Sequence, residues 1–219
     1  MIVRIPNLLT PEELVSLNET LATAEFIDGK LTAGWHAKQV KQNQQLPKAP
    51  STDALKAMIL KALNRNGLFQ AIARPRSIHS VLFSRYQVGM AYGRHVDNAL
   101  MGGFHRSDIS FTIFLSDPTR YDGGELVMEG ADSETPYKLE AGSAIVYPST
   151  TLHRVDPVTR GERLVVVGWV QSLIRDVAQR EILFDLETVK RSRFAQDGKT
   201  DEFDLLSKSI ANLLRQWVD

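Results

Sequence analysis

Hydrophobic positions recur with a helical period near both ends of the chain and with a strand period in its middle. The Thr-Pro-Glu-Glu run at 10–13 is typical of a helix start, with a capping threonine, a proline in the first turn and a glutamate that completes a capping box. A second helix is predicted over about 52–66, with Gly67 as its C-cap. The polar stretch 31–46 predicts a loop, and 2–5 predicts a short strand.

The middle of the chain consists of short segments rich in β-branched and aromatic residues, separated by Gly, Pro and Asp turn signals. These segments are 77–86, 107–115, 124–129, 143–147, 150–155 and 163–171. Many short strands punctuated in this way are typical of a β-sandwich or a barrel.

After these strands the helical period returns, over about 173–193 and 201–217. We therefore expect a domain over 1–172, whose β core spans about 76–172, and a helical C-terminal extension over 173–219. The last helix carries one apolar stripe, formed by Phe203, Leu206, Ile210 and Leu214. This stripe predicts either the surface of a homodimer or packing onto the chain's own β core.

Charge and composition exclude several classes of function. The 219 residues carry 26 basic and 26 acidic side chains, which argues against a broad nucleic-acid-binding surface. The chain has no cysteine, so a disulfide framework, a thiolate metal site and a cysteine nucleophile are ruled out. Neither a signal peptide nor an apolar run near the roughly 20 residues that span a bilayer is found, so we expect a cytoplasmic protein.

Two histidines and one carboxylate form a candidate metal site. His95 and Asp97 are two residues apart, and on a strand this spacing places both side chains on one face. His153 lies in a later predicted strand, and Arg163 follows it. If the two strands fold into a hairpin near Val158, the histidine and the arginine lie opposite each other. Such a ligand set is that of the facial triad of non-haem Fe(II) enzymes, beside a cation suited to a carboxylate.

Other interpretations of these residues are weaker. A His-x-Asp tripeptide alone is more often a surface turn or a hydrogen-bonded pair. His79 alternates with apolar residues and is typical of a structural strand histidine, and a rival metal set with His105 needs an awkward loop. The serine and threonines before His153 lack a nucleophile elbow, and the glycine-rich stretches lack a phosphate-loop lysine.

The residues around these candidates resemble the Fe(II)- and 2-oxoglutarate-dependent dioxygenases, specifically the prolyl-4-hydroxylase-like branch. The run 84–98 is similar to the lead of that branch into its His-x-Asp. The Asp-Gly-Gly-Glu-Leu run at 122–126 and the strand 141–148 before the distal histidine also resemble it. Across the whole chain, the opening 1–13, the segment 33–46 and the helical tail are similar to a bacterial subgroup, the PKHD-type hydroxylases.

This resemblance implies a mainly β fold with flanking helices, built on a double-stranded β-helix, or jelly roll. It implies that His95, Asp97 and His153 bind Fe(II). Arg163 would pair with the C5 carboxylate of 2-oxoglutarate, and Tyr86 would make a supporting contact. As in relatives, L-ascorbate would return stray Fe(III) to Fe(II).

The chain departs from the branch at one position. Relatives often carry a tyrosine on the next strand that helps to hold the C5 carboxylate, and here the matching residue is Phe114. A second contact would then come from elsewhere, for example from Tyr86 or Thr151.

The family also places an N-terminal segment over the active site. Trp35 and Asn43 are therefore candidate substrate contacts, whereas the composition of 31–46 alone predicts that Lys38, Lys41, Asn43 and Gln45 are solvated.

The implied reaction is the hydroxylation of an unidentified substrate by dioxygen, with decarboxylation of 2-oxoglutarate to succinate and CO2. The substrate could be a prolyl or lysyl side chain, a peptide or a small metabolite. Two alternatives stay open at this point. One is a non-catalytic jelly-roll module that senses iron or 2-oxoglutarate, and the other is a nucleic-acid demethylase of the same superfamily.

Overall fold

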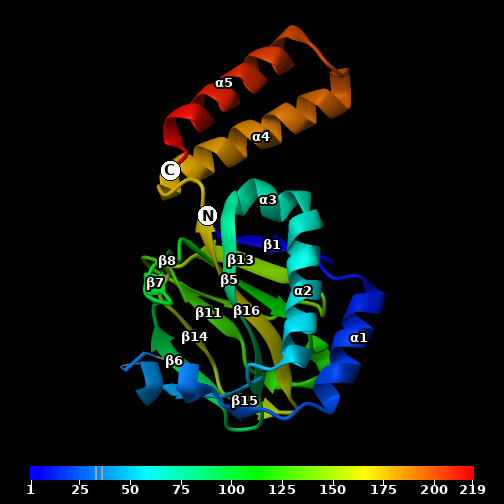
Figure 1. The fold of residues 1–219 in the computed structure, drawn as a ribbon, viewed down its shortest axis with the longest axis vertical. Helices are drawn as coiled ribbons and strands as arrows, with labels where there is room; N and C mark the ends of the chain where they lie inside the picture. Colours follow the sequence, from blue (N-terminus) through cyan, green and yellow to red (C-terminus); the bar gives the residue numbers. More distant parts are fainter. Residues whose placement is uncertain (33, 36) are drawn as a thin grey trace.

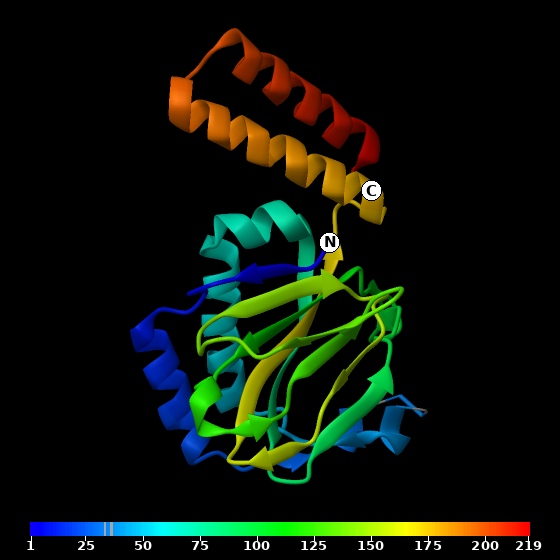
Figure 2. The ribbon, with the colours of Figure 1, turned by 180° about the vertical axis from the view of Figure 1, so that it is seen from behind.

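Two antiparallel sheets face each other and are covered on one side by helices, with a helical hairpin at one end (Figures 1 and 2). The computed structural model describes residues 1–32, 34, 35 and 37–219. Ala33 and His36, in the segment that resembles the PKHD-type hydroxylases, lie outside these residues. The prediction of a mainly β jelly roll with N-terminal helices and a C-terminal helical tail is confirmed.

The larger sheet has seven strands and the smaller has five. The larger sheet is ordered β1 (Val3–Ile5), β13 (Ala144–Pro148), β9 (Ile109–Phe114), β16 (Arg163–Ser172), β5 (Pro75–Tyr86), β4 (Gln44–Gln45) and β2 (Ile27–Asp28). The smaller sheet is ordered β12 (Glu134–Tyr137), β11 (Leu126–Glu129), β14 (His153–Val155), β6 (Ala91–His95) and β3 (Lys41–Gln42). Two short pairs complete the strands: β10 (Asp122–Gly123) with β15 (Val158–Arg160), and β7 (Leu100–Met101) with β8 (His105–Arg106).

The helices are α1 (Pro11–Ala22), α2 (Pro50–Arg65), α3 (Gly67–Ala73), α4 (Val177–Asp197) and α5 (Asp201–Trp217). Single 3-10 turns are η1 (Gly29–Thr32), η2 (Ala37–Gln39) and η3 (Pro118–Arg120). None of the helices within the described part of the chain is long and apolar enough to cross a membrane.

The interior strand β9 is buried on both faces, and the alternation of its side chains separates two environments. Ile109, Phe111 and Ile113 belong to the large apolar core that includes residues of α1, α2 and α3. The intervening residues Ser110 and Thr112 are polar and line a cavity between the two sheets, which Phe111 also borders. Because a strand has a period of two, one set of residues builds the core while the other supplies polar groups to the interior of the jelly roll.

The N-terminal helix starts as predicted. The side chain of Thr10 accepts a hydrogen bond from the Glu13 backbone, and the Glu13 carboxylate accepts one from the Thr10 backbone. Arg65 of α2 bonds the same carboxylate, which ties the two helices together.

The prediction that Gly67 caps the second helix is wrong. Gly67 opens α3, and Asn66 ends α2 and caps α3 through its side chain, which accepts from the backbone of Phe69.

The predicted loop over 31–46 is also wrong, because this stretch contains η2 and two short strands. β3 pairs with β6 of the smaller sheet, and β4 pairs with β5 of the larger sheet. The segment therefore crosses from the edge strand of the smaller sheet to β4 of the larger sheet, which lies between β5 and the edge strand β2. Lys41, Asn43 and Gln45 alternate inward and are buried, while Gln42 between them is exposed.

The hairpin predicted near Val158 does not form. His153 lies on β14, which pairs with β11 and β6, whereas Arg163 lies on β16, which pairs with β5 and β9. The turn between them carries β15, which pairs with β10 instead. Gly123 permits this contact, since its φ is +70° and an added Cβ would lie 2.0 Å from the carbonyl oxygen of Pro157. The chain thus changes sheet where a simple hairpin was expected.

The C-terminal helices form a hairpin that projects from one end of the sheets (Figures 1 and 2). Ile174, Leu183 and Ile210 build a separate small core, against which Leu214 packs. The apolar stripe of α5 therefore lies against α4 and the start of the tail, and the predicted alternative of packing onto the β core is wrong.

Replacing Ile113 by alanine tests the role of the interior strand β9 in stability. Ile113 is fully buried, so the cavity left behind should lower the free energy of unfolding by about 2–5 kcal/mol. Val189 on α4 is 50% exposed, and Val189→Ala should change the free energy of unfolding by less than about 0.5 kcal/mol. Urea denaturation measures both, and an equal loss in the two variants would contradict the described core.

Candidate metal centre

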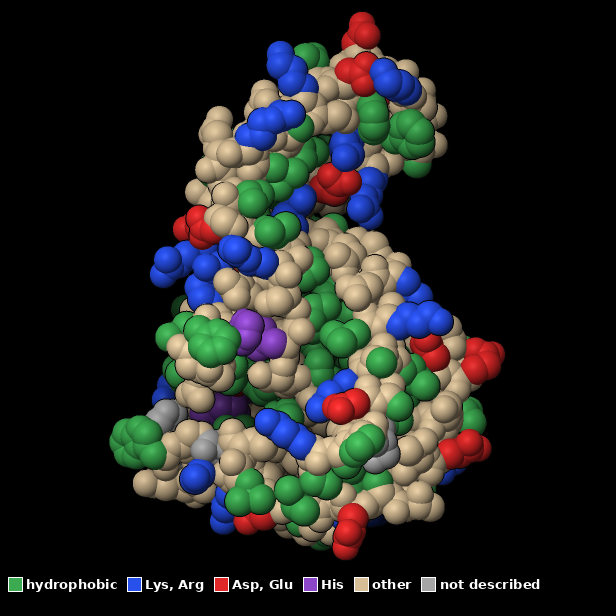
Figure 3. Space-filling view, in the orientation of Figure 1, with side chains coloured by type: hydrophobic (Ala, Val, Ile, Leu, Met, Phe, Trp, Pro, Cys, Tyr) green, Lys and Arg blue, Asp and Glu red, His purple; other side chains and the backbone are tan. Residues whose placement is uncertain are grey.

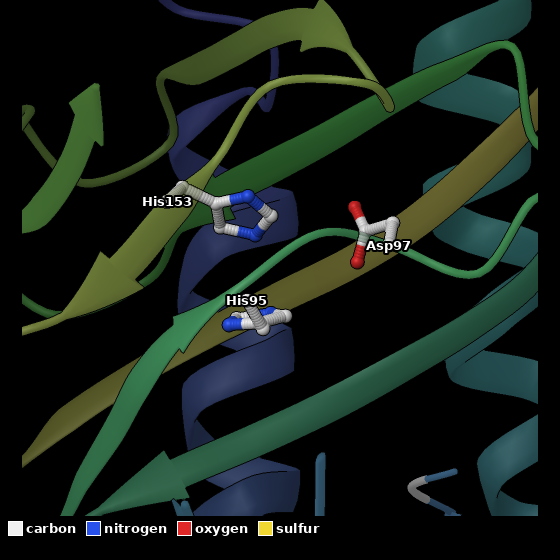
Figure 4. Close-up of side chains that lie close together, drawn as sticks. All are labelled: His95, Asp97 and His153. Carbon is white, nitrogen blue, oxygen red and sulfur yellow. The ribbon is translucent and has the colours of Figure 1, made fainter. Parts of the chain in front are cut away.

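His95, Asp97 and His153 converge from two adjacent strands and the loop after one of them (Figure 4). His95 is the last residue of β6 and is paired with His153 of β14. One ligand atom from each of the three residues lies within 4.8 Å of the others. The strand ends at His95, so the prediction that Asp97 shares a strand face with it is wrong. Another contact must place that carboxylate.

Ser110 supplies this contact. Its hydroxyl donates to Oδ2 of Asp97 at 2.6 Å, and the Ser149 hydroxyl lies 2.8 Å from the Ser110 oxygen. Both serines are buried. The hydrogen bond leaves Oδ1 of Asp97 available to a cation. Sequence reasoning missed Ser110, although the alternation of the strand at 109–114 was a signal that it points inward.

The tautomers of both histidines are determined by backbone carbonyls. Nδ1 of His95 lies 2.8 Å from the oxygen of Gly93, and Nδ1 of His153 lies 2.9 Å from the oxygen of Thr151. A carbonyl oxygen only accepts, so each Nδ1 must carry the hydrogen. The lone pair of each imidazole then lies on Nε2, where a metal can bind it. This donor set fits Fe(II), which takes imidazole nitrogen and carboxylate oxygen on one face.

Burial keeps His95 neutral. Loss of solvent, followed by the nearby charge of His153, lowers the pKa of His95 to about 4. The Tyr92 ring stacks on the His95 imidazole with centroids 3.6 Å apart, which shields that side from water. A neutral imidazole is the form that binds metal, so His95 does not have to lose a proton at neutral pH.

Arg163 lies across the same cavity on the larger sheet, directly paired with Tyr86 of β5. Its side chain is 1% exposed, and the guanidinium lies 5.0 Å from the centroid of the Tyr86 ring and 5.6 Å from that of Phe114. Nε and Nη1 have no hydrogen-bond partner among the described residues. A buried cation with unused donors fits the carboxylate of a ligand, which a planar guanidinium can hold with two parallel bonds.

Small and aromatic residues make room for this arginine. An added Cβ at Gly124, whose φ is +68°, would lie 3.0 Å from Cδ of Arg163 and 3.3 Å from the Tyr121 ring. The Tyr121 hydroxyl is buried, and no group among the described residues lies in hydrogen-bonding geometry to it. Burial raises the pKa of Tyr121, and the nearby charge of Arg163 opposes this rise. Tyr121 was not among the predicted site residues, and no sequence signal marked it.

The remaining predicted site residues lie in different surroundings. Asn43 is 4% exposed and lines the cavity, as does Tyr86. Burial raises the pKa of Tyr86, and the nearby charge of Arg163 opposes this rise. Trp35 is 82% exposed, beside Gly34 and Ala37, which line the cavity. Thr151 contributes its backbone oxygen to His153, and its side chain is not among the described lining residues.

The cavity that joins these groups has a volume of about 760 Å³ and opens on one face of the molecule. Figure 3 shows this face hollowed, with histidine side chains in and beside the hollow. Lys41, Asn43 and Gln45 line it, so the prediction that they are solvated is wrong, whereas Lys38 is exposed as predicted. Burial lowers the pKa of Lys41 to about 8.

His79 and His105 are not part of this ligand group. Nε2 of His79 lies 3.0 Å from the backbone oxygen of Arg106, and its ring stacks on His105. Within the described residues, His95, Asp97 and His153 form the one group of three or more such side chains able to hold a metal. The rival set with His105 is therefore not formed.

Comparison with known proteins gives a consistent result. Residues 81–171 match the model of the 2OG-Fe(II) oxygenase superfamily. A PKHD-type hydroxylase of Picosynechococcus sp. is 64% identical and one of Gloeothece citriformis is 61% identical, each over 100% of both chains.

Solved structures with the same fold are more distant in sequence. A prolyl-4-hydroxylase from Pseudomonas putida superposes with a TM-score of 0.54 at 22% identity, over 78% of this chain and 92% of that one. A 2OG-Fe(II) oxygenase family oxidoreductase from Burkholderia pseudomallei gives 0.58 at 22% identity, over 77% and 84%. These likenesses support the fold alone.

The neutral, buried state of His95 predicts how the stability of the metal-free protein depends on pH. The pKa of His95 is about 4 in the folded protein and 6.5 in its ordinary state. Between these pH values His95 is protonated in the unfolded chain and neutral in the folded one. Stability should fall as the pH drops from about 6.5 towards 4, and the fall should be smaller in His95→Gln. Urea midpoints measured across this range test it, and equal slopes in the two proteins would contradict it.

Proposed function

Because the chain belongs to the PKHD-type hydroxylases of the 2OG-Fe(II) oxygenase superfamily, we propose that His95, Asp97 and His153 bind its Fe(II) and that Arg163 binds its 2-oxoglutarate. The chain is a dioxygenase, an oxidoreductase that uses Fe(II) and 2-oxoglutarate. The observation that carries the assignment to these residues is the pair of histidines whose Nε2 atoms are left free beside a fixed carboxylate.

The proposed reaction converts a substrate C–H bond, 2-oxoglutarate and O2 into C–OH, succinate and CO2. One oxygen atom enters the alcohol and the other enters succinate, so the two-electron oxidation of the substrate is balanced by oxidative decarboxylation of the cosubstrate. Bound Fe(II) supplies the activation of dioxygen, and the protein supplies binding, orientation and shielding from water. The substrate is oriented by the walls of the cavity around the three ligands.

The cosubstrate is oriented by the end of the cavity at Arg163. The unused Nε and Nη1 donors would hold the C5 carboxylate, and Tyr86, whose ring lies beside the guanidinium, would make a supporting contact. Phe114 offers only its ring there, and the Tyr121 ring lies beside Gly124 near the arginine. L-ascorbate would keep the iron reduced between cycles.

The N-terminal segment is proposed to contribute to substrate binding through Trp35 and Asn43. If turnover of the true substrate is unchanged when both are replaced, this assignment fails. We also propose the division into a dioxygenase domain, 1–172, and a helical extension, 173–219, because the extension has its own small core. The exposed apolar side chains on that extension, such as Val189 and Phe194, make it the candidate surface for a homodimer in the cytoplasm.

Asp97→Ala tests the metal assignment. Losing one of three ligands should weaken Fe(II) binding by more than about 100-fold, since changes outside the ligand shell already cost about 10–100-fold. The visible charge-transfer band that forms anaerobically with Fe(II) and 2-oxoglutarate should disappear, and succinate formation with it. Asp132→Ala, at an exposed carboxylate, should keep both. A normal band in Asp97→Ala would show that the ligand assignment is wrong.

Arg163→Ala tests the cosubstrate assignment. Removing a buried cation from its carboxylate partner costs about 2–5 kcal/mol, which corresponds to 2-oxoglutarate binding weakened by about 30-fold or more. Fe(II) binding, measured by calorimetry without 2-oxoglutarate, should be retained. Arg160, three residues earlier, is exposed and paired with Asp122, so Arg160→Ala is the matched control and should bind 2-oxoglutarate normally. Equal losses in the two variants would refute the assignment.

A further inference from the structure

Lys41 is a buried lysine beside the candidate metal centre that the proposed reaction does not use. It lies on β3, at the edge of the smaller sheet, paired with Tyr92 of β6. Its side chain lines the cavity, and the ammonium lies 5.4 Å from the centroid of the Tyr92 ring, which in turn stacks on His95. The residue is 5% exposed. A cation is thus held one aromatic ring away from a proposed iron ligand.

The ammonium has few partners of its own. Nζ donates to the hydroxyl of Thr32 at 3.0 Å, and among the described residues it forms no other hydrogen bond and no ion pair. Thr32 bonds in turn to the side chain of Gln45, whose amide donates to Ser84. This chain of neutral groups holds the lysine in place but does not balance its charge. Asp97 and Asp28 favour the charged form from beyond ion-pair distance. A buried charge with no ion-pair partner is costly, so this ammonium favours an anion that arrives from outside.

The charge of the cavity differs from that of the whole chain. The chain has no net charge, yet Lys41, Lys48, Lys56 and Arg163 line the cavity, and Asp97 is the one carboxylate among the described lining residues. Lys56 is paired with Asp53, and Arg163 is assigned to the cosubstrate. Bound iron would neutralise the charge of Asp97. The cavity therefore favours anions, and Lys41 is the buried cation without an assigned partner.

Lys41 and Arg163 lie on different walls. Lys41 is on the edge strand of the smaller sheet, next to the strand that carries His95, and Arg163 is on β16 in the larger sheet. Burial lowers the pKa of Lys41, and the charges of Asp97 and Asp28 oppose this effect. The charge of Arg163 instead lowers the pKa of three tyrosines, Tyr86, Tyr121 and Tyr147. The two cations are thus suited to two separate anionic groups.

We propose that Lys41 binds a carboxylate of the substrate and that this enzyme acts on a small carboxylic acid, such as an amino acid. The inference rests on the proposed function, which places 2-oxoglutarate at Arg163 and the reacting C–H bond at the iron. The cavity of about 760 Å³ is of the size that holds small ligands. A compact ammonium whose remaining hydrogens point at no other group suits one carboxylate held at a single point.

Paired acids and amides test the inference. The holoenzyme with Fe(II) and 2-oxoglutarate is titrated anaerobically with each proteinogenic amino acid, as the free acid and as the primary carboxamide, while the charge-transfer band is followed. We expect free acids to perturb the band and, on admitting O2, to stimulate succinate formation, with their amides at least tenfold weaker. Gly-X dipeptides with free or amidated C-termini, tested in parallel, distinguish a peptide C-terminus from a small acid as the source of the carboxylate.

Variants connect the effect to this residue. Lys41→Met should weaken the binding of the responding acid by about 10–100-fold, as expected for a hydrogen bond to a charged group, and should remove the preference for acid over amide. Lys41→Arg keeps the charge and should retain part of the preference. Lys38→Met, at an exposed lysine in the same segment, should behave as the wild type.

Two results would overturn the proposal while leaving the proposed function intact. One is that acids bind no better than amides, or that neither binds. The other is that Lys41→Met weakens 2-oxoglutarate as strongly as Arg163→Ala does, since the lysine would then belong to the cosubstrate site. A wild-type protein that forms no band with Fe(II) and 2-oxoglutarate, before any acid is added, would refute the proposed function and this inference together.

Discussion

The structure depends on a strand that is buried on both faces. Strand β9 has helices on one side and the smaller sheet on the other, so neither set of its alternating side chains meets bulk water. Apolar residues suffice on the helical face. On the inner face, hydroxyls such as those of Ser110 and Thr112 must find partners within the protein, because an unpaired buried polar group is costly. The interior of the jelly roll is thereby made polar, which is the environment that a metal and a dicarboxylate require.

Hydrogen bonds to the backbone prepare the histidines for this role. Each imidazole is held by a carbonyl two residues before it in the chain, so its orientation follows from the local path of the strand. The carboxylate is held differently, by a serine from the opposite sheet. The three groups therefore keep their arrangement only while the two sheets stay packed together. Separating the sheets would remove the hydrogen bond that orients Asp97.

Local patterns predicted much of this arrangement, and long-range pairing could not be predicted from them. The capping box at Thr10 and the strand around 109–114 depend on neighbouring residues, and both form as expected. The hairpin at Val158 was wrong because two strands close in sequence each pair with strands far away. The stretch 31–46 looked like a loop because its strands are two residues long and its inward side chains are polar. The sequence predicted that the two histidines and Asp97 converge, but for a wrong reason. The strand ends at His95, so Asp97 does not share its face and is held by Ser110 instead.

The segment 41–45, which passes from the smaller sheet to the larger one, is attached to the fold differently from the groups assigned to iron and 2-oxoglutarate. The groups assigned to iron and 2-oxoglutarate lie on, or next to, interior strands, where a substitution disturbs several neighbours at once. Lys41, Asn43 and Gln45 lie on a strap that joins each sheet through pairs of only two residues. Substitutions there can change the lining of the cavity while the barrel and its metal ligands stay as they are. Under the proposed role of Lys41, substrate preference can change through this strap while the metal ligands stay the same, because the two are encoded in separate parts of the fold.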